Sequence, residues 1–103
     1  MDKRKVIWTR NAEIQLFSIM DYYFERKKSN HYSLKLYRDI SLKLQKLHFK
    51  IALPQKTDKE NLYYFTHNHI SVFFSIELEV IIVKLIWDER RNPDILSEKI
   101  ADI

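Results

Sequence analysis

Two histidines and two adjacent arginines are the residues of this chain whose types are best suited to chemistry. His67 and His69 titrate closest to neutral pH, so either could donate or accept a proton. Arg90 and Arg91 could hold a phosphate through paired N–H groups. Cleavage of RNA without a metal needs a base at the 2′-hydroxyl, a cation at the phosphate and an acid for the leaving oxygen. These residues could supply all three, but a histidine in a tight turn is commonly a polar turn residue, and Arg90 could instead brace a corner together with Asp88.

Composition disfavours most other kinds of site. The chain has 103 residues with no Cys and no Gly. Thiolate metal sites, disulfides, glycine-rich phosphate loops and the nucleophile elbow are therefore absent. His31 and His48 lie at the ends of an expected helix with no partner at ligand spacing, so we expect no metal site and no cofactor. So short a chain can spare few apolar residues for a deep pocket, and we expect no small-molecule substrate.

A basic segment dominates the charge distribution. The chain carries a net charge of +4, and residues 26–50 contain eight Lys or Arg against one acid, Asp39. Such a segment attracts nucleic acid or an acidic protein, although a solvated helix face that keeps the protein in solution has the same composition. We therefore take as candidate target-binding residues Lys35, Arg38, Lys43, Lys46, Arg90 and Arg91.

Hydropathy patterns predict the elements that would position these residues. Apolar residues recur every three or four positions in the first half of the chain, which predicts helices, and every two positions after residue 61, which predicts strands. Asn92 followed by Pro93 is typical of a helix start. The predicted elements are a strand at 5–8, helices at 11–27 and 30–48, strands at 62–66, 69–76 and 80–87, and a short helix at 93–101.

This order predicts an α+β fold of the form β-α-α-β-β-β-α over a single domain, residues 1–103. The two long helices are separated by a short break, so they should form an antiparallel hairpin on one face of an antiparallel sheet. Residues 80–87 are apolar on both faces except for Lys84, which predicts a central strand. No apolar segment approaches the roughly 20 residues that a bilayer span needs, so we expect a cytoplasmic protein without a membrane partner.

Four segments, in this order, carry a resemblance to a known family. They are Val6–Thr9 with Ala12 and Leu16, the helix hairpin ending at Leu47 and Pro54, His69–Ile76, and Ile86–Pro93. Together they resemble the RelE/ParE superfamily of bacterial type II toxins over about residues 5–97. The most characteristic part is Asp88-x-Arg90-x-x-Pro93 directly after an apolar strand. The resemblance implies a small basic toxin encoded beside an antitoxin whose extended C-terminal segment wraps and neutralises it.

The superfamily divides by target. RelE-like members cut messenger RNA on the ribosome, and their pattern has an arginine early in the third strand and a tyrosine in the terminal segment. Arg90 matches their arginine after the fourth strand, but residues 70–72 lack the first arginine and residues 95–99 lack the tyrosine. ParE-like members act on DNA gyrase and usually have an arginine in the second strand, which residues 62–64 lack.

Three functional hypotheses follow from this resemblance. The first is a ParE-like toxin that inhibits DNA gyrase by binding it. The second is a RelE-like nuclease in which Arg90 works with His67 or His69 on ribosome-bound RNA, and Tyr63 or Tyr64 stacks a base. The third is a degenerate member that only binds its antitoxin and regulates a promoter through it.

The second face of the predicted sheet suggests where the antitoxin binds. A helix hairpin covers only one face, and the opposite face carries apolar residues that also need cover. The predicted partner-binding residues are Ser71, Phe73, Ser75 and Trp87. Alternatively, the terminal helix covers this face through Leu96 and Ile100, and we expect the helix and the antitoxin to share it.

Overall fold

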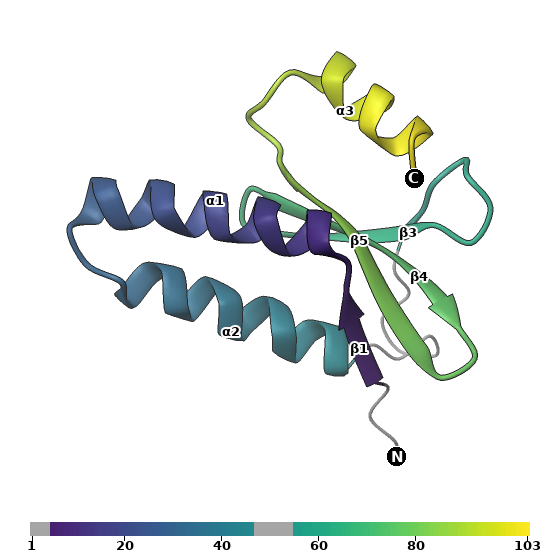
Figure 1. Cartoon of the computed structure of the whole chain (residues 1–103), viewed down its shortest axis with the longest axis horizontal. Coiled ribbons are helices and arrows are strands. Elements are labelled where there is room, and N and C mark those ends of the chain that lie inside the picture. The colour runs from purple at the N-terminus through teal and green to yellow at the C-terminus, as the bar shows by residue number, and fades with distance from the viewer. Residues whose placement is uncertain (1–4, 47–54) are drawn as a thin grey trace.

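The computed structural model describes residues 5–46 and 55–103. A five-stranded sheet carries a hairpin of two helices on one face, and the third helix lies against the other face (Figure 1). The elements are β1 (Lys5–Trp8), α1 (Arg10–Lys27), α2 (His31–Gln45), β2 (Gln55–Lys56), β3 (Tyr63–His67), β4 (Ile70–Glu77), β5 (Val80–Asp88) and α3 (Pro93–Ala101). The predicted α+β class and the helix hairpin on the sheet are confirmed.

The strand order is β1-β5-β4-β3-β2. The last three long strands form the predicted antiparallel meander, and β1 pairs in parallel with β5. β5 is therefore flanked by strands on both sides, which explains its apolar residues on both faces. β2 was not predicted, because its two residues belong to a segment that is polar throughout and has no strand pattern.

A bulge in β5 explains why a cation, Lys84, occurs in this otherwise apolar strand. Phe74 pairs with Val83 but Phe73 pairs with Leu85, so Lys84 is an extra residue in the register. The extra residue reverses the alternation of side chains along β5. Val83 before the bulge and Ile86 after it both face the helices, whereas Leu85 faces α3.

The helix ends follow from their capping residues. Thr9 Oγ1 accepts a hydrogen bond from the Ala12 N–H at 3.2 Å, so α1 begins at Arg10, one residue earlier than predicted. Lys28 ends α1 in the left-handed region, with a φ of 56°. α2 begins after Asn30 and ends at Gln45, and the predicted continuation over residues 47–48 lies outside the described residues.

The hairpin turns use left-handed residues although the chain has no glycine. Asn68 and Leu78 have φ values of 57° and 58°. Asn is among the non-glycine residues that tolerate this region best. The predicted strand bounds, 62–66 and 69–76, leave a turn at His67-Asn68, but His67 pairs with Ile70, so the turn lies one residue later.

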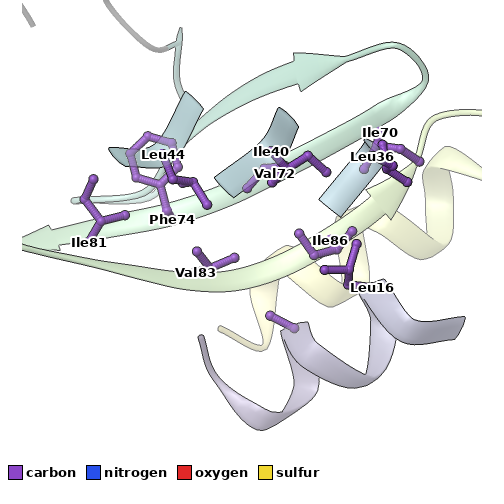
Figure 2. Packing of buried hydrophobic residues seen from close by; sticks show 11 residues of the cluster. Leu16, Leu36, Ile40, Leu44, Ile70, Val72, Phe74, Ile81, Val83 and Ile86 are labelled. Atoms are coloured by element: carbon purple, nitrogen blue, oxygen red, sulfur yellow. The ribbon is translucent and has the colours of Figure 1, made fainter. Parts of the chain in front are cut away.

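Two apolar clusters hold the layers together, one on each face of the sheet. In the larger cluster, the side chains of α1 and α2 meet the inward side of β4 and β5 (Figure 2). Its buried members are Ala12, Leu16, Leu36, Ile40, Leu44, Ile70, Val72, Phe74, Ile81, Val83 and Ile86. The smaller cluster consists of Leu62, Phe73, Leu85 and Trp87, covered by Leu96 and Ile100 of α3 and by Tyr64 and Ile103.

Within residues 5–46 and 55–103, no helix combines the length and apolar character needed to cross a membrane.

Candidate functional site

The connection between β5 and α3 forms a corner that carries Arg90 and Arg91. Asp88 ends the strand, and its Oδ1 accepts the backbone N–H of Arg90 at 2.9 Å. Asn92 caps α3 by accepting the Asp94 N–H at 2.8 Å, and Pro93 lies in the first turn, as the sequence predicts. Side-chain hydrogen bonds therefore hold both ends of this short connection, which we call the arginine corner (residues 88–92).

Arg90 is bound on two sides and is still accessible. Its Nε and Nη2 donate to the two carboxylate oxygens of Asp88 at 3.0 and 2.8 Å, and Nη2 also donates to the Tyr23 hydroxyl at 2.6 Å. Its side chain remains 49% exposed. The hydrogen bonds from Arg90 lower the pKa of Asp88 below its ordinary value, and the carboxylate in turn raises the pKa of Arg90. This is the ion pair that the bracing interpretation predicts.

Arg91 has a different environment. Its guanidinium lies 4.6 Å from the centroid of the Trp87 ring, and its backbone N–H donates to the Asp88 carbonyl at 3.0 Å. No carboxylate among the described residues pairs with its side chain. Arg91 therefore presents a stacked cation whose N–H groups are available to a ligand.

The structure separates the two candidate histidines. His67 faces α2, where its Nε2 lies 3.5 Å from Asp39 Oδ2. Burial, followed by the charge of Lys43, lowers the pKa of His67 below its ordinary value and so favours the neutral ring. His69 is exposed, and its backbone carbonyl accepts the N–H of Glu89, which belongs to the arginine corner. Of the two, only His69 is placed near Arg90.

An acidic side chain lies beside the strand segment in which the RelE-like pattern has an arginine. Ser71 is fully buried, and its hydroxyl donates to the carboxylate of Glu89 and contacts Thr66 Oγ1 at 3.2 Å. The tyrosines proposed to stack a base instead stack within the protein. Tyr63 lies 6.1 Å from Phe74, and Tyr64 lies 5.2 Å from Phe73, where each distance joins ring centroids.

The basic residues of α2 form a second charged surface. Lys35, Arg38, Lys43 and Lys46 are all exposed. Lys35 pairs with Asp39 at 2.9 Å and its hydrogen bond lowers the pKa of that carboxyl, whereas Lys43 lies 5.7 Å from the centroid of the Phe65 ring. Across residues 5–46 and 55–103, no hydrogen bond, ion pair or ring contact joins these side chains to Arg90 or Arg91.

The four predicted partner-binding residues are buried. Ser71, Phe73, Ser75 and Trp87 are each 4% exposed or less. Leu96 and Ile100 of α3 cover Phe73 and Trp87, as the alternative interpretation expects. A partner can reach these two side chains only if α3 moves away.

Two contacts of the site were missed by sequence reasoning. Lys59 Nζ donates to the carbonyls of Ile100, Ala101 and Ile103 at 3.2, 3.2 and 2.9 Å and so ties the end of α3 to the loop before β3. Tyr23 lies at helical spacing with the apolar residues of α1, and no local signal reveals that its hydroxyl meets Arg90. The residues that the structure describes contain no group of three His, Asp or Glu arranged to hold a metal.

Comparison with known proteins gives a likeness at the level of fold. No protein-family model matches the chain, and no curated protein matches it. A solved chain described as "Chromosomal ParDE TA system from P. aeruginosa" superposes with a TM-score of 0.63 at 22% sequence identity. The superposition covers 82% of this chain and 94% of that chain. The two chains therefore share a fold.

Proposed function

We propose that this protein is the toxin of a toxin–antitoxin pair and that it acts in the cytoplasm by binding a protein target, DNA gyrase. The observation that carries the proposal is the fold shared with a chain of the ParDE TA system. The exposed arginine corner supports it, because guanidinium groups are over-represented in protein recognition surfaces. The basic residues of α2 provide a second surface for the same target.

The local charges favour protein binding over RNA cleavage. A nuclease needs cations around the scissile phosphate, but Glu89 places a carboxylate beside Ser71. Two donor groups of Arg90, Nε and Nη2, already bind Asp88 and are not free for a phosphate. His67 faces away from the corner toward Asp39, so a RelE-like reaction would depend on His69 alone as its acid and base.

The antitoxin is the second partner in this proposal. Phe73 and Trp87 would bind it once α3 has left the sheet, and the adjacent Ser71 and Ser75 would then line the same face. α3 covers this face with few contacts, since none of its own residues is fully buried. A partner that supplies its own apolar side chains could compensate for the loss of α3.

Two assays with the purified protein, supported by growth measurements in cells, test this function. We expect the protein to inhibit gyrase supercoiling and to leave messenger RNA on translating ribosomes intact. In cells, Arg90→Ala should reduce toxicity, whereas the His67/His69 double alanine variant should stay toxic. Arg10→Ala is the matched control, since Arg10 is an exposed arginine on α1 outside the corner.

The opposite outcomes identify the alternatives. Cleaved messenger RNA together with loss of toxicity in His69→Ala would establish the nuclease hypothesis. A chain that is harmless when expressed without its antitoxin would establish the degenerate, antitoxin-binding member.

A further inference from the structure

A surface hollow lies between α1 and the arginine corner. Its volume is about 430 Å³, within the range of sites that hold small ligands or single anchoring side chains. It is lined by Ser18, Ile19, Tyr22, Asp88, Arg90 and Arg91.

The arginines around this hollow are not equivalent. Arg90 is held by Asp88 and Tyr23, so its charge is largely neutralised within the protein. Arg91 rests on Trp87, and Arg26 lies 5.4 Å from the centroid of the Tyr22 ring. Neither Arg26 nor Arg91 forms an ion pair within residues 5–46 and 55–103. The hollow is therefore flanked by two stacked cations that lack a negative partner.

The wall of the hollow on α1 is largely apolar. Ile19 is half-buried against the core cluster, and Tyr22 exposes 49% of its surface. Tyr22 is further fixed by an edge contact with Tyr23, with ring centroids 5.4 Å apart. An aliphatic or aromatic side chain fits such a wall, and the Ser18 hydroxyl can bond to a backbone group beside it.

We propose that this hollow binds an acidic peptide segment of a protein partner, with a carboxylate on Arg91 and an adjacent apolar side chain against Ile19 and Tyr22. Arg26 attracts the same segment from the far side of Tyr22, and Arg90 acts as a positioning residue that holds the corner in shape. The inference deepens the proposed function and rests on it, since it names the chemistry by which the toxin holds a protein.

Charge complementarity selects a peptide over a nucleic acid. A nucleic-acid strand carries a phosphate at every nucleotide and needs a continuous track of cations. Outside the hollow, the exposed side of α1 instead presents the apolar residues Ile14, Phe17 and Phe24. The Asp88 carboxylate also lines the hollow, where its charge is paired with Arg90. A peptide that alternates acidic and apolar side chains meets both the cations and the apolar surface.

The probe is a synthetic capped peptide of alternating Asp or Glu and Leu or Phe, titrated into the full chain. We expect the arginine side-chain N–H signals of Arg91 and Arg26 to shift in nuclear magnetic resonance spectra, and those of Arg90 to shift less. Arg91→Gln should raise the dissociation constant of the peptide roughly tenfold, which is the effect of losing one charge-assisted hydrogen bond. Tyr22→Ser should raise it as well, and Arg10→Ala, an exposed arginine of the same helix, should not.

Several results would overturn the inference. Unchanged affinity in both Arg91→Gln and Tyr22→Ser would do so, as would a peptide with Asn and Gln in place of its acids that binds equally well. Tighter binding of single-stranded oligouridylate than of the peptide, with shifts at the same residues, would assign the hollow to nucleic acid. Circular dichroism of each variant verifies that it is folded.

The proposed toxin function and the peptide site can be tested independently of each other. If the chain is not toxic in cells but the peptide binds through Arg91, the hollow is a peptide site on a protein of another function. If the chain inhibits gyrase while Arg91→Gln binds the peptide normally, the toxin proposal stands and this inference is wrong.

Discussion

Arg90 and Arg91 are neighbours in the chain but lie in different environments. The hydrogen bonds of Arg90 to Asp88 and Tyr23 connect the end of β5 to α1, two segments 67 residues apart in the chain. Its exposed part remains at the surface beside Arg91. Arg91 rests on the ring of Trp87, and no carboxylate within residues 5–46 and 55–103 pairs with its charge. The contacts of Arg90 therefore match the bracing role, and target contact is the role that we propose for Arg91.

The Asp88 carboxylate should make stability depend on pH. Its pKa is lowered in the folded chain, so the contribution of its ion pair is complete above the ordinary value of 3.8 and is lost as the pH falls through the lower folded value. We expect Asp88→Asn to lower the free energy of unfolding near neutral pH, and the gap from the wild type to close in strong acid. Urea unfolding followed by circular dichroism across this range measures the gap.

Asp21→Asn is the control, because Asp21 is an exposed acid of α1 without an ion pair in the described part of the chain. A gap for Asp88→Asn that stays constant from neutral to acid pH would show that the carboxylate does not contribute through its charge.

At the scale of elements, α3 is held to the sheet by few contacts. It contributes no fully buried side chain, and Leu96 and Ile100 are its contacts with the smaller cluster. Lys59 compensates by binding three carbonyls at the C-terminal end of the helix. The helix therefore depends on one lysine and two apolar side chains to stay on the sheet.

Replacing Lys59 should loosen α3 without unfolding the sheet. We expect Lys59→Met to speed amide hydrogen exchange in residues 96–101 roughly tenfold, the effect of losing about one charged hydrogen bond. Exchange in β5 should be unchanged. Lys56→Met is the matched control, since the ammonium of Lys56 bonds to carbonyls within its own loop. Equal exchange in α3 of both variants would contradict the role of Lys59.

At the scale of the whole molecule, the sheet is a shared layer between two unequal cores. α1 and α2 bury eleven residues with the inward face of the sheet, whereas the opposite cluster buries four. Most of the free energy of folding therefore comes from the helix-hairpin side, because burial of apolar surface is the dominant favourable contribution. We therefore expect changes on the α3 face to leave the larger core folded.

Truncation in the larger core should be costly. Ile40 is fully buried among the side chains of β4, so Ile40→Ala should lower the free energy of unfolding by about 2–5 kcal/mol. Leu34→Ala, at an exposed position of the same helix, should change it by less than about 0.5 kcal/mol. Chemical denaturation of both variants gives the comparison. Similar losses would mean that α2 does not pack through Ile40 as described.

The sequence by itself determined every described element except β2, and their order, because the signals are local. Helical spacing over residues 11–27, strand alternation over residues 70–76 and the Asn92-Pro93 start of α3 depend on neighbours along the chain, and the structure has these elements within a few residues of the predicted bounds. The exposed cations of α2 are likewise visible as a basic segment.

Tertiary structure alone decided which of these elements and side chains meet. The parallel pairing of β1 with β5, the bulge at Lys84 and the contacts of Tyr23 with Arg90 and of Lys59 with α3 join residues far apart in the chain. Such contacts follow from how the layers pack around a common core. Hydropathy periods cannot predict them, because a period describes only neighbours along the chain. The same packing separated His67 from His69, although only one residue lies between them in the sequence.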